Sequence, residues 1–125
     1  MSTKILIIED EVILIKAIEF KLLKEGYEIS KACDGKEGME KIVSEKPDLI
    51  ICDIMMPFAN GLEILSFVRT KLALATPMVM LTSIGQEETV VKALELGADE
   101  YITKPFSPNE MILRIKKILI KHGIK

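Results

Sequence analysis

The sequence has 125 residues, of which 49% are hydrophobic and 29% are charged, and its formal net charge at pH 7 is -2. This length and composition are typical of one folded domain with its own core, and they exclude a disordered chain. The nearly balanced charge argues against binding to nucleic acid or anionic lipid through bulk electrostatics. We expect a single domain over residues 1–125, with a core from about residue 4 to about residue 121 and no second domain in these residues.

The two cysteines and the apolar runs indicate the compartment. No run approaches the roughly 18 apolar residues that a membrane-spanning helix needs, and the first residues lack the layout of a secretory signal. Cys33 and Cys52 have no CxxC spacing and no histidine beside them, so neither zinc nor a redox pair is indicated. We expect both to be small buried residues near strand ends. This pattern is typical of a reducing cytoplasm, so we predict a cytoplasmic protein without membrane contact.

Strand-like and helix-like segments alternate five times along the chain, which predicts an α/β fold with a parallel sheet. The expected strands are residues 4–8, 27–33, 48–53, 77–82 and 100–103. The expected helices are residues 12 to about 25, 35 to about 46, 61 to about 71, 86–96 and 108 to about 121. In the first helix, Ile15, Ile18 and Leu22 have the spacing of a face that packs on the sheet.

Capping sequences mark the helix boundaries. Asp34–Glu37 and Asn60–Glu63 have the form of a capping box, in which an acceptor side chain precedes a glutamate by three positions. Ser107–Glu110 adds a proline at the first helical position to the same pattern. Gly26 and Gly97 are suited to the left-handed conformation that ends a helix.

Polar residues stand where four of the five expected strands end. They are Glu9 and Asp10, Asp53, Thr82 and Lys104. With right-handed crossovers, the carboxyl ends of parallel strands lie at one edge of the sheet. Each residue alone has an ordinary explanation, such as helix capping for an acid or a solvated loop charge for the lysine. Three acids and one base at the ends of non-consecutive strands predict a common pocket instead.

The acids of this edge predict a magnesium site. Asp10 and Asp53 supply oxygen ligands, and Glu9 is placed to ligate through a water, a set that suits Mg²⁺. The lone histidine, His122, is expected in the last helix, away from this edge. A metal that prefers histidine or cysteine therefore has too few ligands here.

The same edge is suited to a phosphoryl group. Its equatorial oxygens need charge stabilisation, which Mg²⁺, the Lys104 ammonium and the Thr82 hydroxyl would supply from three sides. An aspartate that attacks phosphorus forms an acyl phosphate. Asp53, at the end of the central strand, is the best placed nucleophile.

Four motifs in this order resemble the receiver domain of two-component response regulators. They are Ile7–Glu11, Asp53–Pro57 with Asn60 and Gly61, Leu81–Ser83, and Gly97–Phe106. The resemblance extends from Ile5 to about Ile120. It implies a flavodoxin-like (CheY-like) doubly wound sheet of five parallel strands in the order 2-1-3-4-5, with five helices.

The resemblance also implies residue roles and partners. Asp53 matches the phosphoacceptor, which takes its phosphoryl group from the histidine of a sensor kinase or phosphotransfer protein. Glu9 and Asp10 match the acidic pair that holds Mg²⁺ together with Asp53, and Met55 matches the residue that supplies a backbone carbonyl. A receiver catalyses only its own phosphorylation and dephosphorylation, so we expect no enzyme in the usual sense.

Further matches concern the switch. Thr82 and Lys104 match the residues that contact the phosphoryl group. Tyr101 matches the switch aromatic, which turns inward when Thr82 moves onto the phosphoryl group. The Lys104–Pro105 bond is often cis in this family.

Three positions near the acceptor are expected to affect the bound phosphoryl group: one affects access to it, and two affect how long it persists. Ser83 stands where alanine or glycine is frequent and is expected to narrow access to the phosphoryl group. Met55 and Ile84, two residues after the acceptor and two after the threonine, are both apolar. We therefore predict slow self-hydrolysis.

The expected output surface is formed by the fourth helix, fifth strand and fifth helix. Its apolar candidates are Val91, Leu94 and Ile112, and its charged candidates are Asp99, Glu100 and Arg114. This combination resembles the OmpR/PhoB-type branch, whose receivers dimerise through this face and carry a winged-helix DNA-binding domain. The alternative is core packing with a solvated rim, because helical spacing does not distinguish inner from outer faces.

Parts of the sequence also fit other functions. The chain is either a stand-alone relay or phosphate-sink protein or the receiver of a longer DNA-binding regulator. A haloacid-dehalogenase-type phosphohydrolase would have a second aspartate at the position of Met55. A flavodoxin would have a hydroxyl- and glycine-rich loop where this chain has Glu9–Glu11, which repels phosphate unless a metal intervenes.

Overall fold

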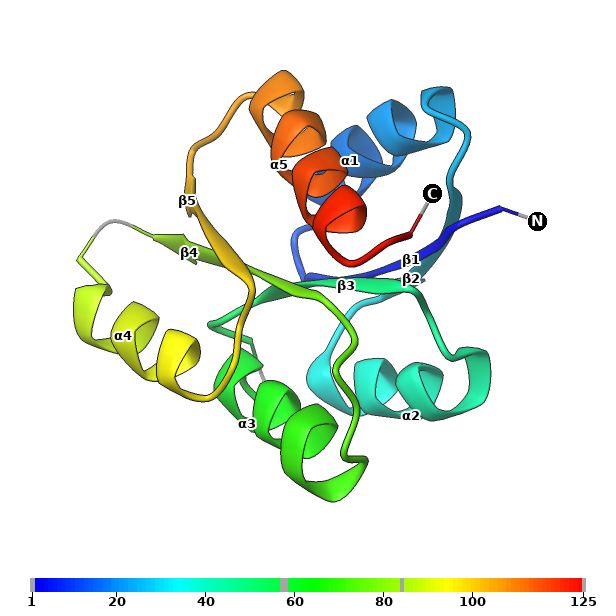
Figure 1. Cartoon of the computed structure of the whole chain (residues 1–125). Helices are drawn as coiled ribbons and strands as arrows, with labels where there is room; N and C mark the ends of the chain where they lie inside the picture. The colour runs from blue at the N-terminus through cyan, green and yellow to red at the C-terminus, as the bar shows by residue number, and fades with distance from the viewer. Residues whose placement is uncertain (1, 57–58, 84, 125) are drawn as a thin grey trace.

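The computed structural model describes residues 2–56, 59–83 and 85–124, and it shows a central sheet with helices on both faces (Figure 1). Five parallel strands lie in the order β2-β1-β3-β4-β5, which confirms the predicted topology. The strands are β1 (Lys4–Ile8), β2 (Glu28–Ala32), β3 (Leu49–Asp53), β4 (Met78–Ser83) and β5 (Glu100–Lys104). The helices are α1 (Val12–Lys24), α2 (Gly35–Glu45), α3 (Gly61–Ser66), α4 (Glu87–Glu95) and α5 (Pro108–Lys121).

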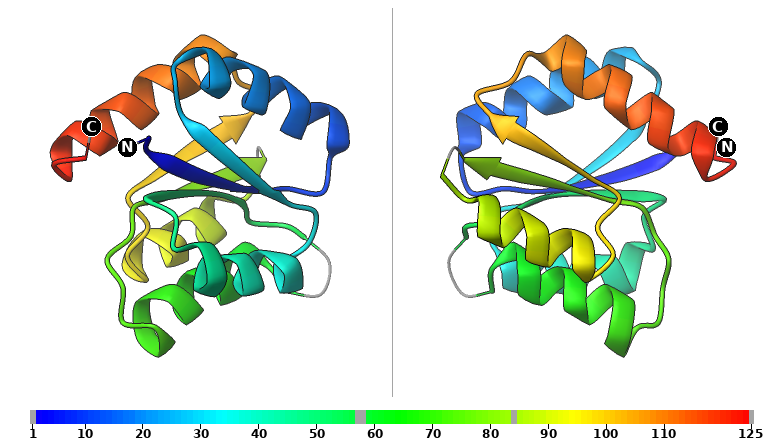
Figure 2. Two further views of the ribbon diagram at one scale, coloured as in Figure 1. Left: turned by 90° about the vertical axis from the view of Figure 1, so that its right-hand side faces the viewer. Right: turned by 60° about the vertical axis from the view of Figure 1, so that its left-hand side comes forward.

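The helices form two layers that bury both faces of the sheet. Helices α1 and α5 cover one face, and α2, α3 and α4 cover the other (Figures 1 and 2). Within β1, Ile5 and Ile7 pack in the α1–α5 core, whereas Leu6 and Ile8 pack in the core on the opposite face. This alternation explains why the central strands are apolar at nearly every position. In the described part of the chain, no helix combines the length and the apolar character needed to cross a bilayer.

The caps form where the sequence predicts them. Asn60 and Glu63 make both arms of a capping box, and the Ser107 hydroxyl accepts from the Glu110 amide at 3.0 Å. The Asp34 carboxylate accepts from the Glu37 amide at 2.8 Å. These caps fix the starts of α2, α3 and α5 directly after the loops that leave the carboxyl edge of the sheet.

One local prediction is wrong, and one helix differs in type from an ordinary α-helix. Cys33 is exposed, because it follows β2, the edge strand of the sheet, whereas Cys52 in central β3 is buried as expected. The third helix reaches Lys71 as predicted, but after Ser66 it continues as a π-helical segment, Phe67–Lys71, in which the Leu72 amide donates to the Phe67 carbonyl at 2.9 Å.

Candidate functional site

The sheet brings the predicted strand-end residues to one edge. Asp53 is the last residue of β3 and lies opposite Leu81 of β4, one position before Thr82. Lys104 is the last residue of β5 and lies opposite Ser83. Glu9, which directly follows β1, completes the edge, because β1 and β3 are neighbours in the sheet. Non-consecutive strands therefore place these side chains around one point.

The Lys104 ammonium is the centre of this cluster. Its Nζ lies 2.9 Å from Glu9 Oε1, 3.2 Å from Asp53 Oδ2 and 3.3 Å from Glu11 Oε1. Burial lowers the pKa of Lys104, but the Glu9 and Asp53 carboxylates outweigh burial and raise this pKa above its ordinary value. One cation thus faces three carboxylates, and the cluster has an excess of negative charge.

Glu9 is the most deeply placed of these acids, with a fully buried side chain. Its Oε2 accepts from the backbone amides of Asp10 at 3.0 Å and Glu11 at 3.1 Å. Its Oε1 has only the ion pair with Lys104 and no aligned hydrogen bond from a described residue. Burial raises the pKa of Glu9 to about 7; the Lys104 ammonium opposes this shift, and the charge of Asp53 adds to it.

The three acids that the sequence assigns to Mg²⁺ lie within reach of one ion. One ligand oxygen each from Glu9, Asp10 and Asp53 lie within 4.8 Å of one another. The donors are all oxygens, the group is rich in negative charge, and Glu9 Oε1 has an unused lone pair. These features fit a hard cation such as Mg²⁺. The Met55 amide donates to Asp53 Oδ1 at 3.2 Å, while the ligand role of the Met55 carbonyl stays a prediction.

Thr82 and its partner form the second half of the site. Its side chain is buried, and its hydroxyl lies 3.0 Å from Oε1 of Gln86. Ser83 donates its backbone N–H to the same oxygen at 2.8 Å. The structure therefore places the Thr82 hydroxyl on a protein acceptor at the start of α4.

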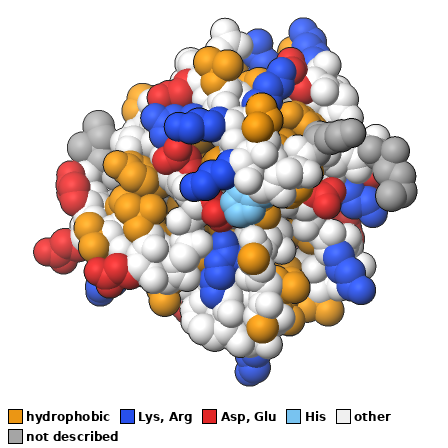
Figure 3. All heavy atoms as spheres, viewed as in Figure 1, with side chains coloured by type: hydrophobic (Ala, Val, Ile, Leu, Met, Phe, Trp, Pro, Cys, Tyr) orange, Lys and Arg blue, Asp and Glu red, His pale blue; other side chains and the backbone are white. Residues whose placement is uncertain are grey.

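A hollow of about 370 Å³ lies beside Thr82, between α4 and β5, and Tyr101 lies in its wall. Val91 and Leu94 line the same hollow and are 52% and 45% exposed. Figure 3 shows hydrophobic side chains gathered over α4 on this side of the molecule.

The peptide bond between Lys104 and Pro105 is cis, as is often found in the family that the sequence resembles.

One apolar member of the predicted output surface is misplaced. Ile112 is only 9% exposed and packs in the α1–α5 core, because it stands three positions before Ile115 on the buried face of α5. The prediction that Ile112 joins Val91 and Leu94 in a surface patch is wrong.

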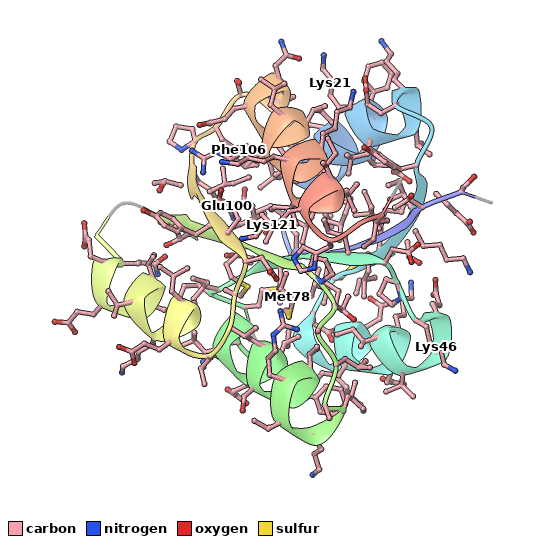
Figure 4. The ribbon with its side chains drawn as sticks, in the orientation of Figure 1. Lys21, Lys46, Met78, Glu100, Phe106 and Lys121 are labelled. Carbon is pink, nitrogen blue, oxygen red and sulfur yellow. The ribbon has the colours of Figure 1, made fainter. Side chains whose placement is uncertain are left out.

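Figure 4 shows residues of the two cores on opposite faces of the sheet. Phe106 lies next to α5 and packs against the same core as Ile112, whereas Met78 lies toward α3, in the core on the opposite face.

The charged candidates of that surface have partners within the chain. Arg114 lies 3.3 Å from Glu100 and 3.3 Å from Glu110. Asp99 lies before β5, at the amino edge of the sheet, and its carboxylate contacts Arg69 at 3.1 Å and His122 at 3.0 Å. His122 is therefore remote from the acidic edge, as expected.

Two residues of the site were missed from the sequence. Glu11 is one of them: the predicted site gives it no role, although its position directly after the acidic pair is a signal that it reaches the same lysine. Gln86 had no signal, because its side chain turns back from the start of α4 to β4, and a pattern of residue types does not show such a turn.

The fold and the acidic edge together define a receiver domain, and the comparisons agree. The family described as response regulator receiver domain matches residues 5–116. The chain belongs to this family, and it is a receiver domain of a two-component system. Neither the phosphohydrolase nor the flavodoxin alternative is favoured.

One similar protein within this family is a longer regulator. It is 43% identical, over 124 residues, to the alkaline phosphatase synthesis transcriptional regulatory protein PhoP of Bacillus subtilis (strain 168). The match covers 99% of this chain and 51% of PhoP, so the chain spans about half the length of this relative.

Solved structures of receivers have the same fold. A CheY-like receiver domain protein of Methanospirillum hungatei JF-1 superposes with a TM-score of 0.93 at 32% identity, with 98% of each chain covered. The receiver domain of NtrX from Brucella abortus superposes with a TM-score of 0.85 at 31% identity, covering 92% of this chain and 97% of that one.

Proposed function

We propose that Asp53 accepts a phosphoryl group from the phosphohistidine of a sensor kinase or phosphotransfer protein in a Mg²⁺-dependent reaction. A carboxylate oxygen of Asp53 forms the new bond to phosphorus while the bond between phosphorus and the donor's histidine nitrogen breaks. The observation that carries the proposal is the contact of Lys104 Nζ with both Glu9 and Asp53, at 2.9 and 3.2 Å. A cation at this position is placed to stabilise the charge of an incoming phosphoryl oxygen.

Each residue of the edge has a role in this proposal. Glu9, Asp10, Asp53 and the Met55 carbonyl would hold Mg²⁺, which when bound would neutralise charge on the phosphoryl oxygens. The Lys104 ammonium contacts one phosphoryl oxygen and orients the Asp53 carboxylate. The Thr82 hydroxyl donates to another oxygen after it leaves Gln86. Since the group that is modified is the chain's own aspartate, the receiver acts only on itself.

Phosphorylation is proposed to switch the face formed by α4, β5 and α5. A phosphoryl group adds roughly two negative charges, and it biases an element that has two arrangements. Thr82 and Tyr101 line the same hollow, which supports a coupled movement of the two. Val91 and Leu94 then offer an apolar surface for a second copy or a target. A sizing column run with and without phosphorylation tests pairing, and Val91→Glu is expected to weaken it.

The likeness to PhoP, which by name is a transcriptional regulatory protein, supports a cytoplasmic receiver that controls a DNA-binding output. In this proposal the described residues form one receiver, and direct contact with DNA belongs to another part of the regulator, because the receiver's net charge is -2. A stand-alone relay or phosphate-sink protein is the less favoured alternative.

The slow self-hydrolysis of the phosphoryl group stays a prediction. Met55 is exposed beside Asp53, and Ile84 lies outside the described residues.

Intact mass after incubation with acetyl phosphate and Mg²⁺ tests the phosphoacceptor directly. We expect a gain of one phosphoryl group that is lost in Asp53→Asn. Asp48→Asn is the matched control, because Asp48 precedes the same strand at the opposite edge, where it accepts from the Lys4 amide at 2.8 Å. Equal phosphorylation of the Asp53→Asn variant would refute the assignment.

A further inference from the structure

One side-chain oxygen links the end of β4 to the start of α4. Oε1 of Gln86 lies 3.0 Å from the Thr82 hydroxyl and 2.8 Å from the Ser83 backbone nitrogen. Gln86 directly precedes α4, yet its side chain does not cap that helix. It turns back to β4, so that the same residue begins α4 and holds Thr82.

The direction of these hydrogen bonds follows from the chemistry of the groups. A backbone N–H only donates, so the Gln86 atom that meets Ser83 is the amide oxygen. That oxygen carries no hydrogen, so the Thr82 hydroxyl is the donor in the second bond. Thr82 is 2% exposed, and its hydroxyl also lies 3.3 Å from the Ser83 carbonyl, a longer distance than that to Gln86. Gln86 therefore accepts the shorter of these two hydrogen bonds from the Thr82 hydroxyl.

A hydroxyl group has one proton to donate, and two acceptors compete for it here. A phosphoryl oxygen on Asp53 requires the same proton that Gln86 accepts in this structure. We propose that Gln86 is a positioning residue that holds the Thr82 hydroxyl away from Asp53 and so opposes the phosphorylated state. The inference rests on the proposed function, because the competing acceptor is the phosphoryl group.

The position of Gln86 also connects this competition to the surface. When Thr82 gives its proton to the phosphoryl group, the Gln86 side chain keeps only its bond from the Ser83 N–H, so the start of α4 loses one of its two side-chain bonds to β4. The hollow of about 370 Å³ that Gln86 and Thr82 line lies directly beside this bond and leaves space into which the first residues of α4 can shift. Gln86 therefore sets the cost of the first step by which the acceptor site acts on α4.

Beryllofluoride with Mg²⁺, a non-covalent mimic of a phosphoryl group on aspartate, is the probe. Its dissociation constant is measured by calorimetry for the wild-type chain, Gln86→Met and Gln86→Glu. Gln86→Met keeps the length of the side chain but removes the acceptor, so we expect roughly two- to tenfold tighter binding, the range for one neutral hydrogen bond. Gln86→Glu keeps an acceptor oxygen and is expected to return the affinity to the wild-type value or below it.

A double-mutant cycle separates this role from a structural one. In the Thr82→Val background no hydroxyl remains, so Gln86→Met is expected to leave the affinity unchanged. Glu88→Ala, in the first turn of the same helix but without a bond to Thr82, is the control and is expected to bind like the wild type. Gln86→Ala is the second variant, with the same expected gain as Gln86→Met.

The outcomes distinguish the two proposals. Equal affinity of the wild type and both acceptor-free variants, or the same gain in the Thr82→Val background, would overturn the role of Gln86 and leave the phosphoacceptor proposal intact. A wild-type chain that does not bind beryllofluoride in Mg²⁺, or undiminished binding by Asp53→Asn, would overturn both.

Discussion

The two edges of the sheet each hold an ion cluster, and the two clusters are built differently. At the carboxyl edge, one ammonium, that of Lys104, faces the carboxylates of Glu9, Glu11 and Asp53. At the amino edge, one guanidinium, that of Arg69, faces the single carboxylate of Asp99. The first cluster has an excess of negative charge, whereas the charges of the second are matched.

Hydrogen bonding follows the same division. Arg69 also donates to the backbone carbonyls of Gly97, Leu74 and Thr76, at distances between 2.8 and 3.1 Å. The other oxygen of Asp99 meets His122, the pale blue side chain between red and blue neighbours in Figure 3. In contrast, Glu9 Oε1 at the carboxyl edge has no aligned hydrogen bond from a described residue.

The difference indicates which cluster serves the fold and which serves chemistry. A matched, fully bonded pair stabilises the packing of the loops that it joins. A buried excess of one charge is unfavourable by itself and is relieved by a cation or by protonation. The following predictions alter the clusters one group at a time and compare the responses.

Removal of Lys104 is expected to have the largest effect. Lys104→Met leaves three carboxylates without their cation, so we expect the free energy of unfolding to fall by about 2–4 kcal/mol in metal-free buffer. Mg²⁺ replaces the lost charge and is expected to recover most of this loss. Urea denaturation with and without Mg²⁺ measures both values. A loss that is the same in both buffers would contradict the account.

Removal of Arg69 is the matched change at the amino edge. Arg69→Met breaks the ion pair with Asp99 and the bonds to three carbonyls, so we expect a loss of about 2–3 kcal/mol. Because this cluster has no excess charge, the loss is expected to be equal with and without Mg²⁺. Recovery by Mg²⁺ would show that the two edges are not as different as their charges suggest.

The pH dependence of stability tests Glu9. Its pKa is raised from 4.5 to about 7 in the fold, so between these values the folded chain holds a proton that the unfolded chain has lost. The free energy of unfolding of the metal-free chain therefore falls as pH rises through this range, by about 3 kcal/mol from this group. Glu9→Gln is expected to abolish this decrease.

The same titration is expected to affect metal binding. Because Mg²⁺ requires the ionised Glu9 carboxylate, calorimetry is expected to show weaker Mg²⁺ binding below pH 7.

Neutralising one aspartate at each edge is expected to have the smallest effects, with opposite signs. Asp53→Asn reduces the charge excess and is expected to raise the free energy of unfolding by about 1 kcal/mol in metal-free buffer. Asp99→Asn removes the partner of Arg69 and is expected to lower it by about 1–2 kcal/mol. Thermal unfolding of both variants gives the comparison, and shifts of the same sign would count against it.

Much of the fold follows from short-range patterns. The spacing of Ile15, Ile18 and Leu22 predicts the buried face of α1 correctly, because these residues pack in the core beneath it. The capping residues predict the starts of α2, α3 and α5. The polar strand ends predict the composition of the carboxyl edge, because parallel topology determines which ends meet.

The errors occur where the environment of a residue depends on a partner that is distant in the sequence. Ile112 and Leu94 are equally apolar, and only the packing of α5 against α1 makes the first one core and leaves the second exposed. The contact of Asp99 with Arg69, thirty positions earlier, likewise has no signal in the sequence, while the place of Asp99 on an interface stays a prediction. Gln86 was missed because its role depends on a side-chain conformation rather than on a residue pattern.

The position of the phosphoryl group is the most direct test of the central claim, that the charge excess at the carboxyl edge serves a phosphoacceptor at Asp53. The chain is incubated with acetyl phosphate and Mg²⁺ and then treated with borohydride, which reduces an aspartyl phosphate to homoserine. Mass-spectrometric sequencing of the peptides locates the change. The account predicts homoserine at position 53 alone. Homoserine at position 10, or a stable phosphoryl group elsewhere with position 53 unchanged, would contradict it.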